Sequence, residues 1–262
     1  MNLWVNWGAM TAPPDEQIRE IFVRMARIWG PQHWWPAQSR FEVIVGAFLT
    51  QNTNWSNVEI AMRKLRSARV LTVAGIRSIA IGDLEQLVRS SGYFRQKAIR
   101  LKAFVRFLDE NYGGSLTRMF AQATEILRGQ LLSLNGVGPE TADSILLYAG
   151  QHPVFVVDAY TRRIASRHNI ASETATYEDL RRLFEQALAN VSLPDEEIAP
   201  ASVGARHPPS RMSLTKRSDS AQVFNEMHGL IVGIGKQYCW KSSPDCEHCP
   251  LADLLPSSSG RS

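Results

Sequence analysis

The stretch LNGVGPETA, residues 134–142, decides the fold that this sequence predicts. Apolar helical residues lead into it, and Gly136 and Gly138 on either side of Val137 permit a very tight turn with positive φ at both glycines. Pro139 suits the first turn of a new helix. The stretch therefore predicts two helices joined by a hairpin, with Val137 filling the gap between them and the glycine N–H groups directed at a phosphate. An ordinary corner between two helices is the alternative.

The rest of the chain is also patterned as helix. Apolar residues recur every three or four positions over residues 14–29, 176–191 and 224–231, which is the spacing of a one-faced helix. The one apolar run that resembles a strand is Val154–Val157, and four residues do not make a sheet. We therefore expect an all-α fold.

Composition narrows the class of protein further. The chain has 262 residues, 44% of them hydrophobic and 21% charged, with a net charge of +4. These values exclude wholesale disorder and fibrous architectures, and no apolar run is long enough to span a membrane. The first residues lack the basic flank of a secretion signal, so we expect a monomeric cytoplasmic protein without membrane partners. The small positive charge permits a polyanionic partner without requiring one.

A second motif follows about twenty residues after the hairpin. The sequence FVVDAYTRR, residues 155–163, places Asp158 between an apolar run and a new helical pattern. Aspartate in that position is a favoured helix N-cap. The same carboxylate is also a candidate for catalysis, and both interpretations stay open at this point.

Taken together, these motifs resemble the endonuclease III-like DNA glycosylases, a superfamily with a helix-hairpin-helix and a Gly/Pro-Asp signature. Three further landmarks agree in order: the helix leading to LTQNT at residues 49–53, GYFRQKA at 92–98, and a C-terminal cysteine loop. The resemblance implies a two-lobed fold. Residues 38–150 form a helical barrel, residues 14–37 and 151–255 form the second lobe, and the active cleft lies between the two.

The resemblance also implies the chemistry. Members of this family flip a damaged base out of double-stranded DNA and cut its N-glycosidic bond. Asp158 matches the aspartate that faces the cationic sugar, whereas Glu140 stands where bifunctional members carry a Schiff-base lysine. The chain is therefore expected to lack lyase activity. Glu140 either orients water or holds a substrate amine, or it is only an acid in the first helical turn, where the helix dipole favours it.

Aromatic residues indicate the branch of the family. Trp34, Trp35 and Pro36 precede the helix that begins near Phe41, and Trp55 follows residues 51–54. This arrangement is similar to the 3-methyladenine glycosylases, where such residues enclose the flipped base. The alternative is that the tryptophans belong to the core. By the same resemblance, Gln51 and Asn52 approach the gap left by the base. The hairpin residues Gly136, Val137, Gly138 and Thr141 hold the DNA backbone.

The three cysteines lie in one short segment, which predicts a metal or cluster site rather than disulfides. The resemblance implies a [4Fe–4S] cluster on Cys239, Cys246 and Cys249, but the fourth ligand position falls on Leu255. A fourth ligand from His248, Asp253 or a small molecule, a Cys₃His zinc site, and no cluster at all are the alternatives.

One segment has no helical pattern. Residues 193–222 are rich in proline and serine and carry Arg206, Arg211, Lys216 and Arg217, so we expect a flexible insertion rather than a DNA-binding element. The leading hypothesis is a monofunctional DNA glycosylase for alkylated purines. The alternatives are a mismatch-specific thymine or adenine glycosylase and a non-catalytic module that binds damaged DNA.

Overall fold

The computed structural model describes residues 12–193 and 209–256. Over these ranges the chain contains twelve α-helices and no β-strand, which confirms the all-α prediction. Among the described residues no helix combines the length and the apolar character needed to cross a membrane. The helices are α1 (Pro14–Trp29), α2 (Arg40–Thr50), α3 (Trp55–Ser67), α4 (Val73–Ser78), α5 (Ile81–Val88), α6 (Phe94–Tyr112), α7 (Leu116–Phe120), α8 (Thr124–Leu132), α9 (Pro139–Ser144), α10 (Ala159–Arg167), α11 (Tyr177–Leu188) and α12 (Asp219–Gln237). Two 3₁₀ turns, η1 (Arg89–Ser91) and η3 (Ala252–Leu254), and a π-helical turn, η2 (Ile145–Gly150), complete the set.

Local sequence signals set several of the helix ends. Pro14 occupies the first turn of α1, and Gly30 ends that helix with φ of 63°. At the start of α11, Thr176 and Asp179 form a reciprocal capping box. The apolar positions of these helices are buried, so the periodicity in the sequence corresponds to one packed face per helix.

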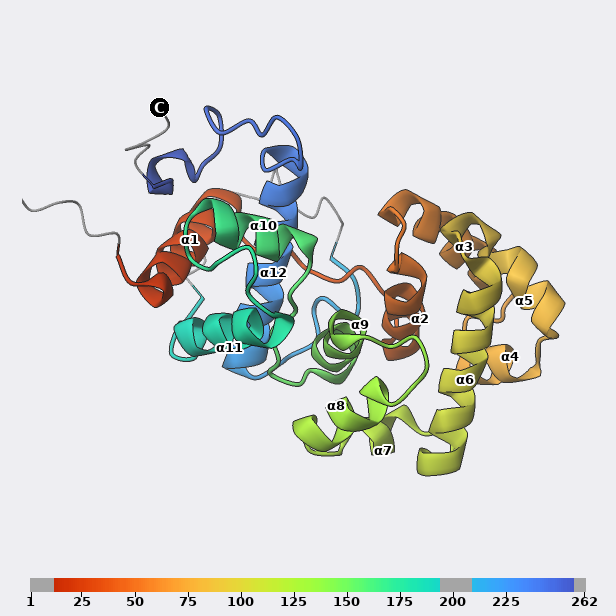
Figure 1. Ribbon diagram of the computed structural model, residues 1–262. Coiled ribbons are helices and arrows are strands. Elements are labelled where there is room, and N and C mark those ends of the chain that lie inside the picture. Colours follow the sequence, from red (N-terminus) through yellow and green to blue (C-terminus); the bar gives the residue numbers. More distant parts are fainter. Residues whose placement is uncertain (1–11, 194–208, 257–262) are drawn as a thin grey trace, which may run out of the picture.

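The helices gather into two groups with α2 and α9 between them (Figure 1). The chain's first long helix, α1, packs on α11 and α12 from the other end of the sequence, and α10 also packs on α12. On the opposite side, α3, α4, α5 and α6 pack together. The lobe boundaries at residues 38 and 150 stay a prediction.

An ion-pair network centred on the buried Arg128 connects α8 and α9 to α11. The Arg128 guanidinium on α8 lies 2.7 Å from Asp143 on α9 and 2.6 Å from Glu178 on α11. The backbone N–H of Val157 donates to the Tyr177 hydroxyl at 3.3 Å. The network therefore ties the hairpin to the segment that leads directly into Asp158.

The expectation of an insertion without helix over residues 193–222 is wrong at its end, because α12 begins at Asp219. Among residues 209–218, Ser210, Met212, Ser213 and Arg217 are buried and the others are partly or fully exposed. Flexibility of the segment stays a prediction. The Met212 N–H donates to the Ala37 carbonyl at 3.0 Å, and the Ser210 hydroxyl donates to the Trp35 carbonyl at 3.3 Å. Backbone pairing, which does not need an apolar face, anchors this segment beneath the loop that carries the tryptophans. Residues 194–208, including Arg206, lie outside the described residues.

The basic residues of this segment behave differently from one another. Arg217 is buried and donates to the Met212 carbonyl at 2.9 Å and to Gln222 at 3.1 Å, so it holds the segment together. Arg211 and Lys216 are exposed. A contact of Arg217 with nucleic acid is therefore excluded in this conformation.

Candidate active site

The hairpin has the predicted form but uses its glycines unequally. Gly136 has φ of 78°, in the left-handed region, whereas Gly138 is extended with φ of −92°. Of the two glycines, which both permit positive φ, only Gly136 uses it, because Gly138 is the N-cap of α9 and an N-cap takes extended backbone. Val137 is buried between the helices, and its N–H donates to the Leu134 carbonyl at 3.0 Å.

Gln51 joins the end of α2 to the hairpin. Its side-chain amide donates to the Gly136 carbonyl at 3.0 Å and to the Thr141 hydroxyl at 2.8 Å, and its oxygen accepts from Arg100 at 2.6 Å. Asn52 next to it is exposed, with φ of 53°. Of the two residues predicted to approach the DNA gap, Gln51 is engaged by the protein and Asn52 projects from the turn.

Asp158 is both the N-cap of α10 and part of a buried cluster. Its Oδ1 accepts from the N–H and the hydroxyl of Thr161 at 2.8 and 3.0 Å, and Thr161 accepts from the Asp158 N–H in return. The other oxygen, Oδ2, lies 3.6 Å from His228 Nε2 on α12. The cap therefore uses Oδ1 and leaves Oδ2 without a hydrogen bond from α10.

Glu140 lies on α9 within electrostatic reach of Asp158. Its side chain keeps contact with solvent, but the surrounding protein and then the Asp158 charge raise the pKa of Glu140 to about 7, against the opposing effect of Arg162. On α12, burial lowers the pKa of Lys236, and Asp158 opposes that change. Two acids and one amine thus meet in one region, with Glu140 able to exchange a proton near neutral pH.

The tryptophans form a contiguous aromatic wall. The ring of Trp35 lies edge-on to Trp55 at 5.0 Å and stacks on Tyr148 at 5.3 Å with an interplanar angle of 25°. Trp34 contacts Trp35 at 5.5 Å and His228 at 6.0 Å. Trp34 and Trp35 are each only 7% exposed, whereas Trp55 and Pro36 are partly exposed. In this conformation the wall offers a base chiefly Trp55, with the other two rings behind it.

Three residues of this region were missed by the sequence analysis: Tyr148, His228 and Arg100. Tyr148 is hidden in the apolar run of η2, and His228 is one polar position in the apolar α12. Both contact residues at least 70 positions away in the chain, so no local pattern could identify them. For Arg100, the sequence showed only that it lies one helical turn after another basic residue, Lys97.

The cysteine loop brings its thiols to one place without completing a ligand set. Cys239, Cys246 and Cys249 line one small cavity of about 20 Å³, together with His168 and Leu255. His248 is exposed and bonds to Asp245, and Asp253 pairs with Arg24 at the surface, so neither supplies the missing ligand here. Within the described ranges no group of three or more metal-binding side chains is arranged to hold an ion. The described side chains therefore supply three of the four thiolates that a [4Fe–4S] cluster normally takes, and Leu255 at the fourth position cannot ligate iron.

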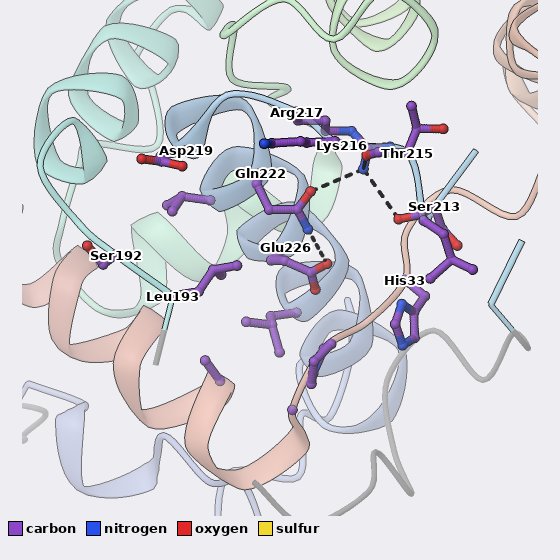
Figure 2. A pocket seen from close by; sticks show the side chains of 16 residues that line it. His33, Ser192, Leu193, Ser213, Thr215, Lys216, Arg217, Asp219, Gln222 and Glu226 are labelled. Carbon is purple, nitrogen blue, oxygen red and sulfur yellow. Dashed lines mark hydrogen bonds between the residues drawn. The ribbon is translucent and has the colours of Figure 1, made fainter. Parts of the chain in front are cut away.

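A larger cavity of about 690 Å³ lies elsewhere, between the end of α1 and the start of α12. Figure 2 shows its wall of Arg217, Gln222 and Glu226, in which Gln222 accepts from Arg217 and donates to Glu226 at 2.9 Å. None of the predicted catalytic or base-stacking residues lines it. This cavity is therefore separate from the region around Asp158.

An all-helical fold with a Gly-Val-Gly hairpin and an aspartate at the following helix start defines the class of helix-hairpin-helix DNA glycosylases. A family model described as HhH-GPD superfamily base excision DNA repair protein matches residues 45–190, more than half of the chain. The chain belongs to this family and is a DNA repair glycosylase.

Individual relatives agree with this assignment. The Methanocaldococcus jannaschii protein MJ1434, provisionally named a DNA repair glycosylase, is 39% identical over 91% of this chain and 96% of its own length. Endonuclease III of Thermotoga maritima is 28% identical over 90% of this chain and 89% of its own length. Among solved structures, H. pylori 3-methyladenine DNA glycosylase bound to 1,N6-ethenoadenine superposes with a TM-score of 0.67 and 26% identity, covering 86% of this chain and 98% of that one.

Proposed function

We propose that this glycosylase removes alkylated purines from double-stranded DNA by hydrolysis and does not cleave the strand. The observation that carries the proposal is that two carboxyl groups, Asp158 and Glu140, lie within electrostatic reach of each other beside a wall of three tryptophans. Glu140 stands at the position where bifunctional relatives carry lysine. A carboxylate beside a cationic sugar is what hydrolysis of an N-glycosidic bond requires. A carboxylate at position 140 cannot form a Schiff base.

The aromatic wall supports the substrate class. N-alkylation makes a purine cationic or electron-poor, and indole faces attract cations. Alkylation also weakens the glycosidic bond, so the site needs little machinery for the leaving base. The structural similarity to a 3-methyladenine DNA glycosylase agrees with this choice.

DNA would be held by the hairpin and by the turn after α2. Gly138 has open space where a Cβ would be, so a phosphate can approach the backbone at the start of α9. Asn52 projects beside it and is the better candidate for the space that the flipped base vacates.

The test is incubation with methylated DNA and with a panel of mismatched duplexes, scoring free base and strand breaks before and after alkali. Release of methylpurine with breaks only after alkali supports the proposal. Release from a thymine or adenine mismatch alone would select the mismatch-specific alternative. Breaks without alkali, together with borohydride trapping, would contradict the loss of lyase activity.

Asp158→Asn separates an enzyme from a binding module. Asparagine caps a helix about as well as aspartate, so the fold and DNA binding should persist while base release collapses. Undiminished base release in this variant would refute the role of Asp158.

A further inference from the structure

A buried chain of polar groups connects the aromatic wall to Asp158. The Tyr148 hydroxyl on η2 lies 2.7 Å from His228 Nδ1, and His228 Nε2 lies 3.6 Å from Asp158 Oδ2. His228 is 4% exposed and Tyr148 is 1% exposed, so no part of this chain is at the surface. The Tyr148 ring stacks on Trp35, which places one end of the chain at the wall and the other at the carboxylate.

The protonation states of the chain follow from its surroundings. Burial raises the pKa of Tyr148 well above its usual value and lowers the pKa of His228, with Asp158 opposing the second change. At neutral pH the phenol is therefore protonated and the imidazole is neutral. A neutral imidazole carries one N–H. In the tautomer in which the phenol donates to Nδ1, the imidazole proton resides on Nε2, which faces Asp158 Oδ2.

His228 Nε2 is a buried donor with no hydrogen-bond partner within the described part of the chain. At 3.6 Å the contact with Asp158 is longer than a hydrogen bond. An unpaired buried donor is costly, and catalytic hydrogen bonds are often long until the substrate is bound. A shift of a few tenths of an ångström would convert this contact into a charge-assisted hydrogen bond.

We propose that His228 is a positioning residue for Asp158, and that Tyr148 fixes the tautomer in which it can act. The proposal rests on the proposed function of Asp158 in base release. Thr161 holds Oδ1 in this structure, and a bond from His228 to Oδ2 formed when substrate binds would stop the carboxylate from rotating. Glu140 on α9 and Lys236 on α12 reach Asp158 through their charges, but the structure gives neither a hydrogen bond to it.

The experiment compares His228→Leu with His228→Gln, whose amide N–H can take the place of Nε2–H. The matched control is His152→Leu, since His152 is also buried, also bonds a hydroxyl through Nδ1 (Thr124, 2.9 Å) and also has an unpartnered Nε2. The readouts are the single-turnover rate of base release from dimethyl-sulfate-treated duplex DNA, and affinity for a duplex that contains an abasic-site analogue.

We expect His228→Leu to lower the single-turnover rate about 10- to 100-fold, the worth of a hydrogen bond to a charged group, with DNA affinity changed less than about twofold. His228→Gln should recover much of the rate, and Tyr148→Phe should lower it to an intermediate value. In an Asp158→Asn background, His228→Leu should cause no further loss. The proposal would be overturned if His228→Leu lowered the rate no more than His152→Leu does. It would also be overturned if His228→Leu lowered the rate by the same factor in the Asp158→Asn background as in the wild type.

A readout independent of activity separates this inference from the proposed function. The ¹⁵N NMR spectrum of His228 should show the proton on Nε2, and that signal should shift in Asp158→Asn, whereas the His152 signal should not. If the wild-type protein releases no base, the proposed function is wrong, but the spectrum still shows whether His228 Nε2–H contacts Asp158. A proton on Nδ1 would overturn the inference even in an active enzyme.

Discussion

The ion-pair network behind the hairpin makes a quantitative prediction about stability. The Arg128 guanidinium contacts both carboxylate oxygens of Asp143, at 2.7 and 3.0 Å, and Asp143 is fully buried. Arg128→Met removes this partner and leaves the carboxylate in a site with little solvent. Removing one member of a buried pair costs about 3–5 kcal/mol. For a protein of this size that loss corresponds to a fall in melting temperature of roughly 6–20 °C.

The pH dependence of this loss has a definite sign. Burial already raises the pKa of Asp143 above its usual value with Arg128 present, and loss of Arg128 raises it further. A carboxyl group whose pKa is higher in the folded than in the unfolded state favours folding at low pH, and this contribution is lost as the pH rises through the folded pKa. Thermal melts should therefore show a larger deficit for Arg128→Met at about pH 8 than at about pH 5.

Two controls make the stability prediction refutable. Arg182→Met removes an exposed pair with Asp179 on the neighbouring face of α11 and should leave the melting temperature nearly unchanged. The double variant Arg128→Met/Asp143→Leu removes both charges and should recover most of the loss, because the cost comes from the unpaired carboxylate. If Arg128→Met resembles Arg182→Met, or if the double variant is no more stable than the single one, the argument fails.

Three further predictions concern the site. Trp55→Ala should reduce the efficiency of alkylpurine release about 5- to 150-fold, because stacking contributes roughly 1–3 kcal/mol. Trp240→Ala, at another partly exposed tryptophan, should leave the efficiency unchanged. Equal rates for Trp55→Ala and the wild type would mean that Trp55 does not belong to the pocket. Because the pKa of Glu140 is about 7, the pH profile of base release should have an inflection near pH 7 that Glu140→Gln abolishes, and an unchanged profile would assign Glu140 a structural role. Leu255→Cys, which supplies a fourth thiolate, should raise the iron and sulfide bound per chain as measured by metal analysis and absorbance. No iron in either protein would mean that the loop does not bind a cluster, and equal iron in both would mean that three thiolates are sufficient.

Local patterns predicted those parts of the molecule that depend on neighbours in sequence. The hairpin and the N-cap role of Asp158 each involve residues close together in sequence, so spacing and residue type were sufficient. The periodicity of apolar residues gave the helical class for the same reason. The family resemblance then supplied roles for Asp158 and Glu140 that spacing alone could not.

The remainder required contacts between distant segments. His228 lies 70 residues beyond Asp158 and 80 beyond Tyr148, and a single histidine in an apolar helix has no pattern that points to either. Residues 209–218 lacked an apolar face because hydrogen bonds from the Met212 backbone and the Ser210 side chain hold them to the tryptophan loop. Gly138 could not be distinguished from Gly136 by sequence, since glycine adopts either sign of φ and only the position of the helix start decides.

The position of Asp158 at a helix start explains how one side chain meets both structural and chemical demands. Its Oδ1 satisfies the first turn of α10 and fixes the direction of the carboxylate, which leaves Oδ2 as the oxygen that can face a substrate. The start of a helix favours negative charge, and the transition state of N-glycosidic hydrolysis places positive charge on the sugar. The capping geometry therefore orients the charge and stabilises it, and the catalytic interpretation does not compete with the structural one. Asparagine at this position would keep the cap and lose the charge, so a loss of base release at unchanged melting temperature would attribute catalysis to the charge itself.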